Sequence, residues 1–235
     1  MSPNLDLRGR KASTARTLVH RVLRERIVSL DLEPGAAVSE GDLAAELGVS
    51  RTPVRESLIL LAEEGLIHVY PQPGSFVARI DVQQVRDAQF IREAVELAAL
   101  HAAAARATPA DIAALRALIA AQREADATTF FTLDDDFHRS LMAAAGHESA
   151  WRIVGSAKGH LDRVRRLSLP IPNTIERLID EHTDVVDHLE AGREPDAVAA
   201  LQRHLRGVFD DLDTIRARHE DLFEHGQALA RRRAA

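Results

Sequence analysis

The sequence predicts a mainly α protein of two parts: a small N-terminal domain over residues 13–79 and an all-helical domain over residues 82–230. Three observations predict this fold class. Apolar residues recur at helical spacing through most of the chain. Two short β-forming stretches, LIHVY and SFVAR, flank the turn PQPG and indicate one small hairpin. Beyond this hairpin no strand pattern competes with the helical one, so a bundle of six or seven helices is expected.

Composition limits the classes of protein that this chain can be. With 235 residues and 46% apolar content, it can bury a sizeable core. Its net charge of −6 argues against a protein that coats nucleic acid by bulk charge, so any nucleic-acid contact must be local. The chain has no cysteine, which excludes thiolate metal sites. No run of 18 uncharged apolar residues occurs, so we expect a cytoplasmic protein without a membrane span.

The first two helices are bounded by recognisable start and stop signals. The first runs from Thr14 to about Leu30, and the Pro-Gly pair that follows ends it. Ser39 is expected to cap the second helix, and Gly48 fits the left-handed residue at which such helices stop. A turn of only a few residues then leads to the third helix.

The third helix carries arginines at the end where the peptide dipoles are already positive. Ser50 or Thr52 is expected to cap this helix, which places Arg51 and Arg55 in its first turns. Two arginines four residues apart are, on their own, more typical of a solvated helix face. Here two helices precede them and a hairpin follows, which describes a winged helix-turn-helix whose last helix enters the DNA major groove. An anion outside the chain, the DNA phosphate, is then expected to complete the site.

The segment PGAAVSEGDLAAELGVSRTPVRESLILLAEEGLIHVYPQPGSFV resembles the DNA-binding domain of GntR-family transcription regulators, and SRTPVRESL is its most specific part. The resemblance implies that Gly74 lies at the wing tip and that four residues of the third helix contact the operator. Those four residues are Ser50, Arg51, Thr52 and Arg55. The chain departs from the family pattern at Gly41, a position that is often arginine, so operator preference is expected to differ.

The second domain should consist of helices alone. One helix covers residues 85–106, and the next opens with Thr108 as its cap and Pro109 in its first turn. Further helical stretches cover roughly 128–145, 148–168, 173–191 and 195–230.

Polar residues interrupt the apolar faces of three of these helices. Asp134 and His138 lie four residues apart on one face, while Asp135 and Asp136 are expected to face solvent. His182 and His204 lie on the last two long helices at equal distances from the turn at Arg193, about 16 Å at 1.5 Å per residue, so an antiparallel pairing brings them to one level. One carboxylate and three imidazoles in a bundle interior predict a divalent metal site, with zinc first and nickel, manganese or iron as alternatives. A single histidine on an apolar face is more often an ordinary core residue than a metal ligand. Here polar residues from three helices are expected to meet at one place, which favours a metal site.

The segments IREAVELAAL, DDDFHRSLMAAAGHESAW and DEHTDVVDHLEAGREPDAVAALQRHL, in this order, resemble the FCD ligand-binding domain of the FadR subgroup of GntR regulators. The resemblance implies a metal held by the same Asp134, His138, His182 and His204. It also implies a small carboxylate effector, such as a sugar acid or hydroxy acid. Arg92 matches a family position that faces the effector cavity, and Arg163 is expected to do the same.

These patterns together predict a regulator and not an enzyme. We expect a homodimeric repressor that binds a pseudo-palindromic operator in double-stranded DNA and responds to a carboxylate effector bound at the metal. One alternative is a metal sensor in which the metal itself is the signal. Another is a metallohydrolase, because open Asp/His sites also activate water. The apolar faces offer no further Glu as a general base, and a hydrolase would leave the winged helix unexplained.

Overall fold

The computed structural model describes residues 12–70 and 74–224, and the chain forms two compact units. The described residues up to 82, together with 219–224, make up the N-terminal unit, and residues 83–218 make up the helical unit. The chain therefore passes between the units twice. The expected boundary at residue 230 differs from this division, because the described residues from 219 to 224 belong with the N-terminal unit.

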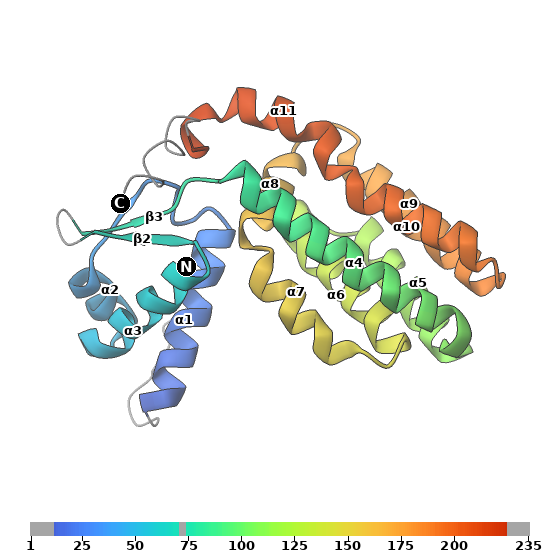
Figure 1. Cartoon of the computed structure of the whole chain (residues 1–235), viewed down its shortest axis with the longest axis horizontal. Helices are drawn as coiled ribbons and strands as arrows, with labels where there is room; N and C mark the ends of the chain where they lie inside the picture. The colour runs from blue at the N-terminus through green and yellow to red at the C-terminus, as the bar shows by residue number, and fades with distance from the viewer. Residues whose placement is uncertain (1–11, 71–73, 225–235) are drawn as a thin grey trace, which may run out of the picture. The chain divides into compact units, whose positions relative to one another are not determined.

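Three helices and a small sheet build the N-terminal unit (Figure 1). The helices are α1 (Ala12–Val28), α2 (Glu40–Leu47) and α3 (Arg51–Glu63). The strands are β1 (Ala37–Val38), β2 (Ile67–Val69) and β3 (Ser75–Val77), with β3 in the middle of the sheet and antiparallel to both neighbours. The hairpin of β2 and β3 confirms the expected wing, whose residues 71–73 lie outside the described part. The short β1 strand was not expected from the sequence.

Capping explains where the helices of this unit begin and end. The Ser39 side chain accepts a hydrogen bond from the Asp42 amide, and Gly48 ends α2 with a φ of +67°. Both observations agree with the expected signals. Helix α3 differs, because Ser50 occupies its N-cap position but its side chain makes no capping hydrogen bond, and Thr52 already lies inside the helix. The start of α3 therefore keeps unsatisfied backbone N–H groups and positive potential.

Residues 219–224 form a strap on the N-terminal unit. A short 3₁₀ turn (Glu220–Leu222) leads into Phe223, which is 1% exposed and pairs with Ile80 as a parallel bridge. The Ile80 amide donates to the Leu222 carbonyl at 2.8 Å, and the Glu224 amide donates to the Ile80 carbonyl at 3.0 Å. Arg79 Nε also donates to the Asp221 carbonyl. The expected single helix over 195–230 is therefore wrong for residues 219–224, and residues 225–230 lie outside the described part.

The helical unit contains α-helices only, together with one 3₁₀ turn (Glu148–Ala150). Its helices are α4 (Val82–Arg106), α5 (Pro109–Arg123), α6 (Ala127–Ala144), α7 (Trp151–Ala157), α8 (Gly159–Ser168), α9 (Thr174–Glu190), α10 (Glu194–Arg206) and α11 (Val208–Arg218). Thr108 caps α5 in a full capping box with Asp111, as expected. None of the described helices combines the length and apolar character that a membrane-spanning helix needs.

Two breaks divide stretches that were expected to be continuous helices. The helix expected over 148–168 breaks at Lys158, whose side chain is drawn inward between two carboxylates. The helix expected from 195 breaks at Gly207, beside which the Arg177 guanidinium lies so close that a Cβ atom would come within 2.9 Å of it. Helical periodicity reveals neither break.

The main core of the helical unit lies among α5, α6, α9 and α10. Phe130, Phe137, Leu115 and Leu201 are buried there. Helices α9 and α10 form the antiparallel hairpin that the sequence predicted. This core positions the polar cluster described next.

Candidate metal centre and nucleic-acid interface

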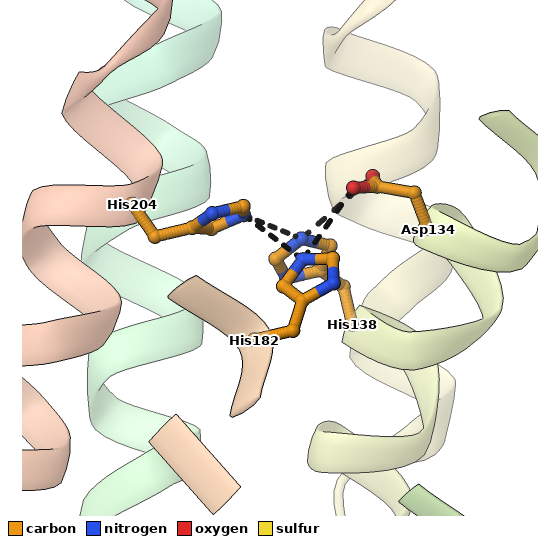
Figure 2. Close-up of side chains that lie close together, drawn as sticks. All are labelled: Asp134, His138, His182 and His204. Atoms are coloured by element: carbon orange, nitrogen blue, oxygen red, sulfur yellow. Dashed lines mark hydrogen bonds and ion pairs between the residues drawn. The ribbon is translucent and has the colours of Figure 1, made fainter. Parts of the chain in front are cut away.

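Four buried side chains from three helices converge inside the helical unit, and they are the four that the sequence predicted. Asp134 and His138 come from α6, His182 from α9 and His204 from α10 (Figure 2). One ligand atom from each lies within 4.8 Å of the others. His204 Nε2 is 3.2 Å from His138 Nε2 and 3.3 Å from His182 Nε2. The Asp134 carboxylate lies 3.5 Å from His182 Nε2 and 3.8 Å from His138 Nε2.

Each histidine turns its other ring nitrogen toward an oxygen atom. His182 Nδ1 lies 2.9 Å from Gln122 Oε1, and the Gln122 amide is oriented by donation from its Nε2 to the Leu133 carbonyl. His204 Nδ1 lies 2.8 Å from Glu181 Oε2. His138 Nδ1 lies 2.7 Å from Glu96 Oε2, close enough for a hydrogen bond but outside its angular range, so this contact is electrostatic.

These outer contacts assign the tautomers of the three rings. An oxygen beside each Nδ1 favours the form with the proton on Nδ1. Every Nε2 then presents a lone pair, and that of His204 faces those of His138 and His182 across 3.2 and 3.3 Å. Such an arrangement is repulsive without a cation. Metal-binding histidines in proteins are held in this way, with the outer N–H on a carboxylate or carbonyl. The residues present therefore fit a divalent metal.

The protonation states agree with this assignment. Burial lowers the pKa of both His138 and His182 well below the usual histidine value, and the charge of Arg92 lowers it further for both. Both rings are thus neutral at neutral pH. Burial alone would raise the pKa of Asp134, but the charges around it, with Arg165 the largest, together outweigh burial and hold the pKa well below the ordinary value. Neutral imidazole and ionised carboxylate are the forms that bind metal.

A buried ion network surrounds Asp134. Arg165 of α8 contacts Asp134, Asp135 and Asp162. Lys158 Nζ lies 2.7 Å from Asp135 and 2.8 Å from Asp162. The expectation that Asp135 faces solvent is only partly met: its side chain is 27% exposed, and two cations pair with its carboxylate.

A cavity of about 30 Å³ adjoins the cluster. Asp134, His204, Arg92 and Arg165 contribute to its wall. Arg92 is 3% exposed; its Nε donates to Glu96 at 2.7 Å, while its Nη2 has no hydrogen-bond partner among the described residues. Arg92 therefore lies where the sequence placed it, with a donor available to an anion. Arg163 does not line this cavity: it is fully buried, and its Nη2 lies 3.0 Å from His160 Nδ1.

Several residues of the centre were not identified from the sequence. Glu96, Gln122, Glu181 and Arg165 all belong to it. Two weak signals existed. Glu96 follows Arg92 by four residues on one helix face, and Gln122 is a polar residue on the apolar face of α5. Neither signal indicates which histidine such a residue would contact.

On the N-terminal unit, the start of α3 is exposed. Ser50, Arg51, Thr52 and Arg55 all lie at the surface, and Gly74 has a φ of +122°, a conformation that only glycine adopts easily. At Arg55, an external anion would not be the only partner of the guanidinium. The chain itself supplies a carboxylate there, because Glu40 of α2 pairs with Arg55 at 2.9 Å.

Comparison with known proteins agrees with both halves of this description. Residues 16–77 match the family of bacterial regulatory proteins named gntR, and residues 87–207 match the FCD domain. The chain is 48% identical over 212 residues to an HTH-type transcriptional regulator in an unstable DNA locus of Streptomyces ambofaciens, covering 89% of this chain and 90% of the relative. It is 37% identical over 210 residues to the transcriptional repressor RspR of Escherichia coli, and the match covers 87% of this chain and 92% of the relative.

The fold agrees with a solved structure as well. McbR/YncC of Escherichia coli superposes with a TM-score of 0.71 at 20% identity, covering 87% of this chain and 98% of that one. The matched relatives are transcription regulators and not enzymes. With a winged helix in front of a helical unit of the FCD type, the chain belongs to the GntR family of DNA-binding transcription regulators.

Proposed function

We propose that this regulator is a homodimeric repressor whose operator binding is controlled by a small carboxylate effector bound at a metal in the helical unit. The observation that carries the proposal is the cluster of Asp134, His138, His182 and His204, whose Nε2 lone pairs converge beside a cavity. We further propose that it acts in the cytoplasm, where its DNA is.

The cluster supplies the metal ligands, and the arginines supply the anion contacts. Asp134 and the three histidines would hold a divalent ion, zinc first, with nickel, manganese or iron as alternatives. When bound, this ion offers a Lewis-acidic centre for carboxylate and hydroxyl oxygens of a sugar acid or hydroxy acid. Arg92 would pair with the remaining negative charge through its Nη2. Arg165, which lines the cavity, is better placed for an effector contact than Arg163 of the same helix.

The size of the cavity supports coupling between effector binding and conformation. A space of about 30 Å³ holds roughly two water molecules. An organic acid can therefore enter only if the wall moves, and Val208 and Asp211 of α11 are part of that wall. Helix α11 continues into the strap that pairs with Ile80. Effector binding can change DNA affinity only if the DNA-competent and incompetent states bind the effector differently, and displacement of α11 would provide that difference.

DNA contact is assigned to α3 and the wing. Ser50, Arg51, Thr52 and Arg55 would meet the operator, with Gly74 at the wing tip. In a symmetric dimer, two such helices would enter major grooves about 34 Å apart on a pseudo-palindromic site.

A thermal-shift screen of sugar acids and hydroxy acids tests the proposal, with the full chain either metal-loaded or treated with chelator. We expect stabilisation by acids only in the metal-loaded protein, and its loss in His182→Ala. Arg92→Lys keeps the charge but loses the planar fork, so it should weaken acid binding while metal content stays unchanged. A comparison of Arg165→Lys with Arg163→Lys shows which arginine of α8 contributes to acid binding. Equal stabilisation with and without metal would contradict the proposal.

The second candidate is a metal sensor. Four ligands from the chain can close a tetrahedral site, which leaves no position for an organic acid. Two titrations separate the metal sensor from the acid-responsive repressor. In the first, operator binding is measured as metal is added without any acid; in the second, acids are added at saturating metal. If acids release DNA while metal occupancy stays fixed, the metal-sensor function is excluded.

A further inference from the structure

Arg55 and Glu40 form a two-point ion pair on the exposed side of the helix-turn-helix. Arg55 Nε lies 3.0 and 3.1 Å from the two Glu40 oxygens, and Arg55 Nη2 lies 2.9 Å from Oε2. The Arg55 side chain is 66% exposed and the Glu40 side chain 30% exposed. Rotation of the guanidinium would break these contacts. Its plane is therefore oriented before DNA arrives.

The pairing uses one edge of the guanidinium and leaves another edge available. An arginine has five N–H groups in a planar fork. Glu40 takes the edge formed by Nε and Nη2, and among the described residues Arg55 Nη1 has no hydrogen-bond partner. The remaining end presents two parallel N–H groups. This pair matches either O6 and N7 of guanine or two oxygens of a phosphate.

The charge of Glu40 favours guanine over phosphate. Its hydrogen bond with Arg55 lowers the pKa of Glu40, so the carboxylate stays ionised at neutral pH. The pair as a whole is nearly neutral, and a carboxylate close to a phosphate is repelled. Arg51 forms no salt bridge with any described residue, although its charge also contributes to the lowered pKa of Glu40. Its guanidinium lies over Gly41, where a Cβ atom would come within 3.3 Å of Nη2.

We infer that Glu40 is a positioning residue that orients Arg55 for a guanine base and keeps it away from phosphate. Arg55 then supplies sequence discrimination, and Arg51 supplies affinity through phosphate. The glycine at position 41 leaves room for Arg51 to lie in this place. The inference rests on the proposal that α3 contacts DNA.

The test uses Glu40→Gln in the full chain, because glutamine keeps the size of the side chain and removes its charge. The probes are the duplex that the wild-type protein enriches most from a randomised library and a scrambled duplex of equal composition. We expect the affinity ratio between the two to fall about tenfold, within the range for one bidentate base contact. Binding to the scrambled duplex should tighten, and its log-log salt slope should steepen by about one, because Arg55 is released to neutralise a phosphate.

Matched variants separate positioning from stability. Arg55→Ala should lower the ratio as Glu40→Gln does, whereas Arg51→Ala should weaken both duplexes in parallel. Replacing individual guanines by 7-deazaguanine removes the N7 acceptor; at one position this should weaken the wild type but not Arg55→Ala or Glu40→Gln. In the Arg55→Ala background, Glu40→Gln should not lower the ratio further.

Two outcomes would overturn the inference. Glu40→Gln could lower the melting temperature and weaken both duplexes equally, which indicates a structural role only. Its effect on the ratio could also persist unchanged in Arg55→Ala, which means that it does not act through Arg55. If Arg51→Ala and Arg55→Ala both leave DNA binding intact, the assignment of α3 to DNA fails instead, whatever Glu40→Gln does.

Discussion

At the scale of single residues, the metal centre depends on groups that do not bind metal. The Nδ1 contacts of His182 and His204 decide which ring nitrogen carries a proton, and therefore where each lone pair points. Gln122 is the clearest example. Its amide lies between the Leu133 carbonyl and His182, so only one orientation satisfies both contacts.

Gln122→Ala tests this role. The variant loses the acceptor that holds the His182 tautomer, so metal affinity should fall roughly 10- to 100-fold, as for other outer contacts of metal ligands. Competition with a chromophoric chelator measures the change. Arg123→Ala, at the exposed neighbouring position, serves as the control and should bind metal as the wild type does. Unchanged affinity in Gln122→Ala would show that His182 is oriented by packing alone.

At the scale of elements, side-chain caps fix where α2, α5 and α6 start, and a buried charge network lies at the break between α7 and α8. Thr108 satisfies the Asp111 amide, and the Asp111 carboxylate accepts from the Thr108 amide at 2.8 Å. This reciprocal bonding involves only residues three positions apart in the chain. The break at Lys158, in contrast, depends on carboxylates from both α6 and α8.

Thr108→Ala should lower the free energy of unfolding by about 1 kcal/mol, because α5 loses its side-chain cap. Thr214→Ala, an exposed position inside α11, should be neutral or slightly stabilising, since alanine has the higher helix propensity. Chemical denaturation followed by circular dichroism measures both. Equal effects of the two substitutions would contradict the capping account.

Lys158→Met should destabilise the helical unit by about 3 kcal/mol, the lower end for breaking a buried ion pair, because Arg165 still faces Asp135 and Asp162. Arg139→Met provides the control. It removes a partner of the exposed Asp136 at 3.1 Å and should cost less than about 1 kcal/mol. If the two variants lose the same stability, the buried network does not hold the break between α7 and α8.

At the scale of the whole molecule, two covalent connections join the units, and both meet at Ile80. The chain leaves the wing through Ile80 into α4, and it returns from α11 to pair with the same residue through Phe223. Phe223 is 1% exposed, so the strap contributes to the core of the DNA-binding unit.

A chain that ends at Arg218 should lose this contribution, whereas a chain that ends at Glu224 should keep it. Removing one buried phenylalanine typically costs about 3 to 5 kcal/mol. We therefore expect faster hydrogen exchange at the Ile80 amide and weaker DNA binding in the shorter chain, with metal content unchanged. Equal exchange rates in the two truncated chains would mean that the strap adds no stability.

The sequence by itself determined the features that depend on neighbours along the chain. Helical spacing placed Asp134 and His138 on one face, equal distances from Arg193 placed His182 and His204 at one level, and the caps at Ser39 and Thr108 followed from local backbone bonding. These arguments need only the geometry of one helix or one hairpin.

Only the tertiary structure decided contacts between elements distant in the chain. It paired Glu40 with Arg55, placed Arg165 instead of Arg163 beside Asp134, and returned Phe223 to Ile80. Helical period alone could not separate Arg163 from Arg165, because that choice depends on which neighbouring helix faces each side chain. Long-range electrostatics and packing set those partners, and no spacing rule within one element encodes them.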